Sequence, residues 1–124
     1  MSNQFSLKKR VESFKYAGKG IKSFICKEHN AWIHCTAIIL VTVAGFTFGI
    51  TRTEWICVVI CFATVLTAEA FNTAIERLVD LVSPDRHPVA GNVKDIAAAA
   101  VLISAIATAI VGLIIFIPYI IKQF

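Results

Sequence analysis

Three long stretches with almost no charged residues limit what this chain of 124 residues can fold into. Residues 31–50 and 96–121 contain no formal charge, and residues 55–75 contain only Glu69. Each stretch is long enough to cross a hydrocarbon core, which needs about 20 apolar residues in a helix. The composition agrees, because 57% of the residues are hydrophobic and the mean hydropathy is +0.75. The sequence therefore predicts an all-α membrane protein with transmembrane helices at 31–50, 55–80 and 96–121.

The segment that precedes the first apolar stretch is predicted to be an amphipathic helix over residues 5–28. Apolar side chains such as Phe14 and Ile21 are interleaved with lysines at a period closer to that of a helix than to that of a strand. Helices with one basic and one apolar face lie in the membrane interface. Anionic lipid headgroups attract such a segment, so the net charge of +4 gives no reason to expect a nucleic-acid partner. We expect residues 1–124 to form a single domain in contact with the bilayer.

Most basic residues fall on one side of the predicted spans. Of the twelve lysines and arginines, seven precede the first span and three, Arg77, Arg86 and Lys94, lie between the apolar stretches 55–75 and 96–121. Arg52 and Lys122 fall on the other side. Because the cytoplasmic segments of membrane proteins are rich in lysine and arginine, we expect the N-terminus and residues 77–95 to face the cytoplasm.

Four polar side chains lie where the second span runs into a charged segment. They are Glu69, Asn72, Glu76 and Asp80, at spacings of three, four and four residues. At about 100° per helical residue, all four project from one narrow stripe of a helix. A carboxylate in hydrocarbon costs at least about 2.5 kcal/mol, so Glu69, inside the span, marks a candidate functional site.

The polar stripe offers the oxygen ligands that bind Mg²⁺ together with phosphate. Mg²⁺ prefers one or two carboxylates plus phosphate oxygens, and Glu28, at the end of the surface helix, is expected at about the same depth. Lys94 and Asp95, directly before the third span, add a cation for phosphate charge and a further acceptor. The sequence contains no GxxxxGK[ST], HRD or DFG motif, which excludes a P-loop and a protein-kinase site. A nucleotide site in this chain would be assembled from helix ends.

Two features of the first span predict contacts between helices. His34 is expected to face the bundle as a hydrogen-bond donor rather than to bind a metal. Gly45 and Gly49 form a GxxxG motif, which permits close helix approach but also occurs often by chance.

The residues around the polar stripe resemble one known family. Residues 69–80 read EAFNTAIERLVD, and KDIAA follows from residue 94. With Pro84 and the His87-Pro88 pair between them, these motifs closely resemble the prokaryotic diacylglycerol kinase family, which includes the undecaprenol kinases. The likeness extends over nearly the whole chain, from Ser13 to Phe116.

The resemblance implies a small homotrimeric kinase of the bacterial plasma membrane, with sites between protomers that open to the cytoplasm. Such an enzyme transfers the γ-phosphoryl group of MgATP to the hydroxyl of a membrane lipid alcohol. Glu69 resembles the family's general base, and Glu28 and Glu76 resemble its metal ligands. The positions that resemble those lining the nucleotide and its phosphates are Lys9 or Arg10, Tyr16, Asn72, Glu76, Asp80, His87, Lys94 and Asp95. The family usually has an arginine seven residues before the tyrosine, where this chain has Lys9 followed by Arg10.

The acceptor and the class of function each have alternatives. Asn30, His34, Thr73 and the His87-Pro88 pair look more like the undecaprenol branch of the family, so undecaprenol is favoured over diacylglycerol. A proton-coupled transporter would also place Glu69 inside a span, but it does not need the charged residues that crowd the cytosolic end. A purely structural membrane protein would need none of the acidic residues.

Overall fold

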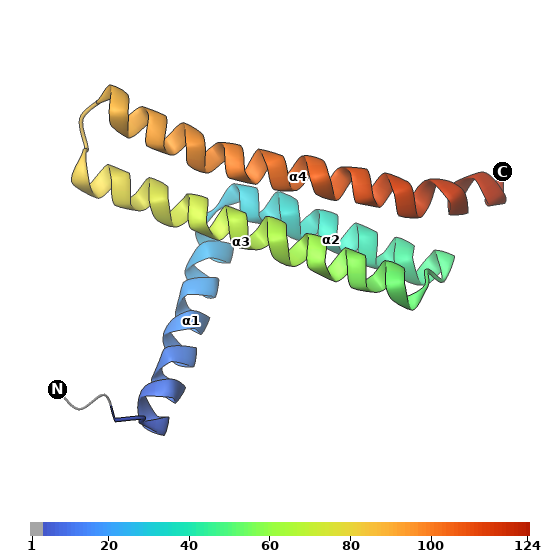
Figure 1. The fold of residues 1–124 in the computed structure, drawn as a ribbon, viewed down its shortest axis with the longest axis horizontal. Coiled ribbons are helices and arrows are strands. Elements are labelled where there is room, and N and C mark those ends of the chain that lie inside the picture. Colours follow the sequence, from blue (N-terminus) through green and yellow to red (C-terminus); the bar gives the residue numbers. More distant parts are fainter. Residues whose placement is uncertain (1–3) are drawn as a thin grey trace.

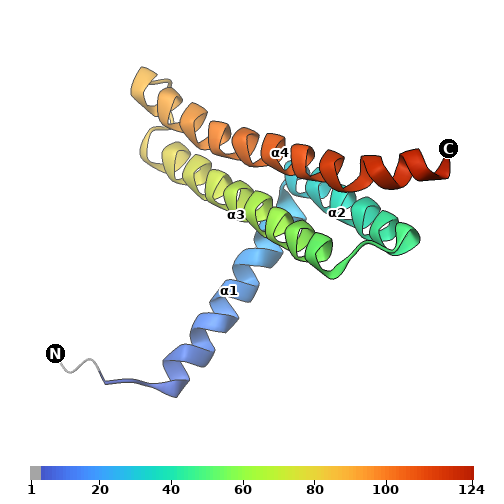
Figure 2. The same cartoon turned by 45° about the vertical axis from the view of Figure 1, so that its right-hand side comes forward.

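A computed structural model describes residues 4–124 as four α-helices, and no strand occurs in that part of the chain. The helices are α1 (Leu7–Lys27), α2 (His29–Phe48), α3 (Arg52–Val82) and α4 (Pro88–Gln123). Figures 1 and 2 show α2, α3 and α4 side by side as a bundle, with α1 pointing away from it. The last three helices are each long and apolar enough to cross a membrane. The predicted fold, one N-terminal amphipathic helix followed by three apolar helices, is therefore confirmed.

Helix α1 stands apart from the bundle over most of its length. It begins after Ser6, whose hydroxyl accepts a hydrogen bond from the Lys9 N–H at 3.4 Å, as an N-cap residue does. No residue of α1 is buried. The helix meets the bundle near its C-terminal end, where the indole N–H of Trp32 donates to the carbonyl oxygen of Ile25. Because α1 runs across the direction of the other helices, it would lie along the membrane surface when they span the membrane (Figure 1).

Local chemistry fixes the turn between α2 and α3. Gly49 ends α2 in the left-handed conformation, with φ at 63°, which glycine adopts without a steric penalty. Thr51 and Glu54 then form a capping box, in which each side chain accepts the backbone N–H of the other residue at 3.2 and 2.9 Å. These caps end α2 at Phe48 rather than at the expected residue 50, and they start α3 at Arg52 rather than at residue 55.

Helices α3 and α4 form a hairpin that is longer than the two predicted spans. α3 continues to Val82, and α4 begins at Pro88, eight positions before the apolar stretch that starts at residue 96. His87 caps α4, since its Nδ1 accepts the Val89 N–H at 3.1 Å, and Pro88 occupies the first turn, where a missing N–H costs nothing. The two helices have 31 and 36 residues, well beyond the about 20 that a hydrocarbon core needs. Their hairpin therefore extends past the junction of α1 and α2 (Figure 1).

A small hydrophobic core joins the helices at the end of the bundle away from α1. Ile50, Val58 and Ile115 are buried there. The Trp55 indole fills the space beside Gly45, where an added Cβ would come within 2.6 Å of the ring. Many other large apolar side chains are exposed, as on surfaces that contact lipid or further protein.

Candidate active site on α3 and the neighbouring helices

The predicted polar stripe begins on a buried face of α3. Glu69, Asn72 and Thr73 expose only 2%, 6% and 5% of their surface. Glutamate is almost never this buried unless it is paired. A carboxylate with such burial, inside an apolar span, points to a functional site.

Glu69 contacts His34 of α2. The His34 Nε2 lies 3.5 Å from the Glu69 Oε2, and the His34 side chain is 21% exposed. His34 therefore faces the bundle, in agreement with its predicted orientation. It also lines an apolar cavity of about 280 Å³ between α2, α3 and α4.

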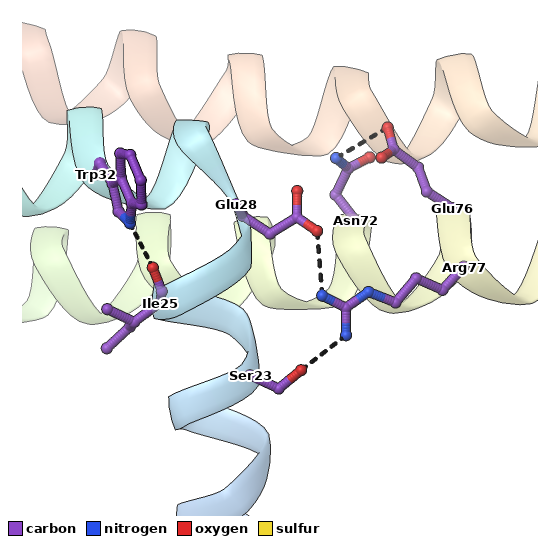
Figure 3. A network of polar contacts seen from close by, with 7 residues as sticks. All are labelled: Ser23, Ile25, Glu28, Trp32, Asn72, Glu76 and Arg77. Atoms are coloured by element: carbon purple, nitrogen blue, oxygen red, sulfur yellow. Dashed lines mark hydrogen bonds and ion pairs between the residues drawn. The ribbon is translucent and has the colours of Figure 1, made fainter.

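Asn72 and Glu76 form the next part of the stripe. The Asn72 Nδ2 donates a hydrogen bond of 3.5 Å to the Glu76 Oε1 (Figure 3). The Asn72 Oδ1 is buried and has no hydrogen-bond partner among residues 4–124. Leaving a buried acceptor unsatisfied costs about 1–3 kcal/mol, so a cation or a donor on a ligand would bind favourably here. Carboxylate and amide oxygens are hard ligands, and this pair therefore fits Mg²⁺.

Glu28 forms an ion pair with an arginine rather than a cluster with other acidic residues. Its Oε1 accepts a hydrogen bond of 3.1 Å from the Arg77 guanidinium, which also donates to the Ser23 Oγ at 3.1 Å. Figure 3 shows Glu28 beside the part of α3 that carries Asn72, Glu76 and Arg77. In the described part of the chain, no three histidine, cysteine, aspartate or glutamate side chains gather closely enough to hold a metal ion. The two expected ligands, Glu28 and Glu76, would thus need oxygens from a bound phosphate or from another protomer to complete a site.

The end of the stripe meets α4. The Lys94 ammonium donates a hydrogen bond to the Asp80 Oδ1, and the two side chains are 37% and 65% exposed. Asp80, His87 and Lys94 line a hollow of about 250 Å³ over the connection between α3 and α4. Asp95 follows Lys94 on the exposed side of α4. The structure therefore brings these predicted residues together at one end of the α3–α4 hairpin.

The remaining predicted residues lie on α1, away from the stripe. Lys9 and Arg10 line a hollow at the N-terminal end of α1, where Arg10 lies 5.6 Å from the centroid of the Phe5 ring. Tyr16 is exposed halfway along the helix, with the Lys19 ammonium 5.8 Å from its ring centroid. Within one chain, these residues do not reach Glu69.

The bundle and its site define a class of protein. A buried carboxylate lies within the apolar helices, and next to it oxygen ligands and a lysine line the polar end of the same hairpin. This arrangement suits an enzyme that joins a membrane-embedded substrate to a charged, water-soluble one. The chain belongs to the prokaryotic diacylglycerol kinase family, whose sequence profile matches residues 15–116, and it is accordingly a membrane lipid kinase.

Individual relatives are named after two different lipid substrates. The chain is 37% identical over 112 residues to the undecaprenol kinase of Bacillus subtilis, covering 90% of this chain and 91% of that protein. It is 38% identical over 105 residues to a diacylglycerol kinase of Synechocystis, covering 81% of this chain and 58% of that protein. It is 32% identical over 108 residues to the diacylglycerol kinase of Haemophilus influenzae, covering 84% and 86%. The family resemblance is confirmed, and it decides against the transporter and the structural protein.

Proposed function

We propose that this chain is a kinase that uses MgATP to phosphorylate the hydroxyl of undecaprenol, giving undecaprenyl phosphate. The observation that carries the proposal is the buried Glu69 carboxylate, which lies inside an apolar span, about one helical turn from Asn72 and two turns from Glu76. A lipid hydroxyl inside the membrane and a nucleotide at the hairpin end could both reach this position. Diacylglycerol is the second candidate acceptor, because relatives of similar identity carry that name.

In the proposed reaction, Glu69 acts as the general base. The lipid oxygen attacks the γ-phosphorus of ATP, a new P–O bond forms, and the bond between the γ-phosphorus and the β,γ-bridging oxygen breaks to release ADP. The lipid hydroxyl proton passes to the Glu69 carboxylate. General bases of this kind contribute about 10²–10⁴ in rate.

The polar end of the hairpin would bind the nucleotide. Asp80, His87, Lys94 and Asp95 line or adjoin the hollow there. The Lys94 ammonium would then exchange its contact with Asp80 for one with phosphate oxygens, stabilising charge on the transferring group. Glu76 and Asn72, together with Glu28, would hold Mg²⁺, which supplies neutralisation of phosphate charge when bound.

The proposed active form is a homotrimer with sites between protomers. Within a single chain, Lys9, Arg10 and Tyr16 lie on α1, which points away from the bundle that carries the stripe (Figure 1). The helices of the bundle also expose broad apolar surfaces. In a trimer, α1 of one protomer could bring these residues to the stripe of its neighbour. The distribution of basic residues supports an N-terminus and a site on the cytoplasmic side of the bacterial inner membrane.

The acceptor can be tested by direct competition. Purified protein in one bilayer is offered undecaprenol and diacylglycerol at equal mole fraction with labelled ATP and Mg²⁺, and the labelled lipids are separated. We expect most of the label in undecaprenyl phosphate. Label mainly in phosphatidic acid would establish the second candidate instead.

A further inference from the structure

We propose that His34 positions the Glu69 carboxylate at the mouth of the cavity between α2, α3 and α4, and that this cavity takes the hydroxyl end of the acceptor's chain. The inference rests on the proposed function, because it takes Glu69 as the group that receives the proton. His34 itself is a positioning residue and does not enter the chemistry.

The contact between the two side chains crosses from one helix to another. Nε2 of His34, on α2, lies 3.5 Å from Oε2 of Glu69, on α3. A glutamate side chain has several rotatable bonds, and in an apolar span few other polar groups can select one of its rotamers. The His34 imidazole, within ion-pair distance on the neighbouring helix, provides that selection, as supporting polar contacts do in preorganised sites.

The cavity begins at this contact and runs away from α1. Its lining follows α2 from His34 to Val41, α3 from Leu66 back to Phe62, and α4 from residue 105 to residue 112. Because α3 runs antiparallel to the other two helices, all three segments lead in the same direction. Glu69 lies about one helical turn beyond Leu66, at the end where His34 is. A chain lying in the cavity would therefore present its terminal hydroxyl to Glu69.

The size and lining of the cavity indicate the kind of chain that fits. An apolar cavity of about 150 Å³ is enough to bind benzene, so one of about 280 Å³ has room for roughly ten carbons. Apart from His34 and Thr108, the lining side chains are apolar. The hydroxyl of a polyprenol is attached directly to hydrocarbon, whereas that of diacylglycerol lies next to two ester groups. Burying ester oxygens without hydrogen bonds costs free energy, so the cavity favours the end of a single isoprenoid chain.

Two substitutions at His34 separate positioning from packing. His34→Leu keeps a bulky side chain and removes the N–H, and we expect kcat to fall about 10- to 100-fold with KM for ATP unchanged. His34→Gln keeps an N–H donor of similar reach, and we expect it to recover most of the lost kcat. Unchanged kcat in His34→Leu, or equal losses in both variants, would overturn the positioning role.

A third substitution tests the cavity. Ala105→Leu adds volume at the mouth, and we expect KM for undecaprenol to rise about tenfold while KM for ATP stays constant. Ala107→Leu makes the same change on the same helix but outside the cavity lining, and it is the matched control. If Ala105→Leu does not fold, Ala109→Val narrows the same cavity. An unchanged KM for undecaprenol in a folded cavity variant would overturn the assignment of the cavity.

The activity of the unsubstituted parent protein distinguishes failure of this inference from failure of the proposed function on which it rests. A parent that transfers phosphate to no lipid would overturn the proposed function, and this inference with it. If the parent is active but kcat is unchanged in His34→Leu, or KM for undecaprenol is unchanged in the cavity variant, this inference alone would be overturned.

Discussion

Glu69 is the residue on which the chemical interpretation depends. It is 2% exposed in a span whose other residues from 55 to 75 carry no formal charge. A structural role would not require an acid at this depth, because a neutral side chain would avoid the cost of burying a charge. Its contact with His34 and its place one turn from Asn72 instead suit proton transfer beside a bound phosphate.

The first prediction concerns this carboxylate. Glu69→Gln keeps the size and most of the polarity of the side chain but cannot accept the proton, and we expect kcat to fall at least about 100-fold. Binding of ATP, measured by calorimetry on the reconstituted protein, should be retained, because the residues proposed to bind the nucleotide at the hairpin end lie farther along α3 and α4. Glu12→Gln on the exposed face of α1 is the control. Near-normal turnover in Glu69→Gln would remove Glu69 from the mechanism.

Residues close together in the sequence were easier to predict than residues brought together by the fold. The polar stripe follows from helical spacing alone, and its first members are indeed buried on one face of α3. Arg77 was missed, because its partners Ser23 and Glu28 are 54 and 49 positions away. Nothing in the local pattern distinguishes Arg77 from the other basic residues at this end of the spans.

At the scale of helices, the ends were the part that hydropathy alone could not predict. Apolar stretches indicated which segments cross the membrane, but the ends depend on caps. Gly49 stops α2, the Thr51–Glu54 box starts α3, and His87 with Pro88 starts α4. The last of these lies in a polar segment that hydropathy does not associate with a span, so α4 begins well before the predicted boundary.

The second prediction concerns the packing of α2 on α3. A methyl group at Gly45 would come within 2.6 Å of the rigid Trp55 indole, so Gly45→Ala should destabilise the bundle by about 1–3 kcal/mol. Gly112→Ala is the matched control, because nothing lies within 4 Å of its added Cβ. The midpoint of thermal unfolding in detergent should fall for the first variant and stay close to the parent for the second. Equal midpoints would show that α2 and α3 do not pack as described.

The third prediction concerns the attachment of α1. Arg77 joins Ser23 of α1 and Glu28 to α3, and both members of the ion pair are partly exposed, at 48% and 30%. A pair of this kind is worth about 0.2–1 kcal/mol, so Arg77→Ala should loosen α1 without unfolding the bundle. Hydrogen exchange should become a few-fold faster over residues 20–28 and stay unchanged in α3. Arg52→Ala, at the opposite end of the bundle, is the control, and unchanged exchange near Glu28 in Arg77→Ala would contradict the attachment.

At the scale of the whole molecule, the candidate site residues of one chain fall into two separate groups. The stripe, its lysine and the cavity belong to the bundle, whereas Lys9, Arg10 and Tyr16 extend away from it on α1. The family resemblance predicts sites between protomers, but residue spacing contains no information on which copy of the chain supplies each residue.

The fourth prediction tests that distribution. Protein carrying Glu69→Gln and protein carrying Arg10→Ala together with Lys9→Ala should each be nearly inactive. When the two are mixed, dissociated and reassembled, some sites would combine an intact stripe from one chain with an intact α1 from another. We expect kinase activity to return, to roughly a quarter of the parent level or less, because about one in four sites of randomly mixed trimers combines an intact stripe with an intact α1. No recovery in reassembled trimers would place α1 at the stripe of its own chain.

The central claim is that this membrane protein transfers phosphate from nucleotide to a buried alcohol at the Glu69 end of its cavity. Its most direct test measures labelled phosphate in extracted lipid after the purified chain is incubated with labelled ATP and Mg²⁺, in bilayers with and without undecaprenol. The account predicts label in lipid only when the alcohol is present, and its loss in Glu69→Gln. Absence of label from every lipid at saturating ATP and Mg²⁺, or equal label in the Glu69→Gln variant, would contradict it.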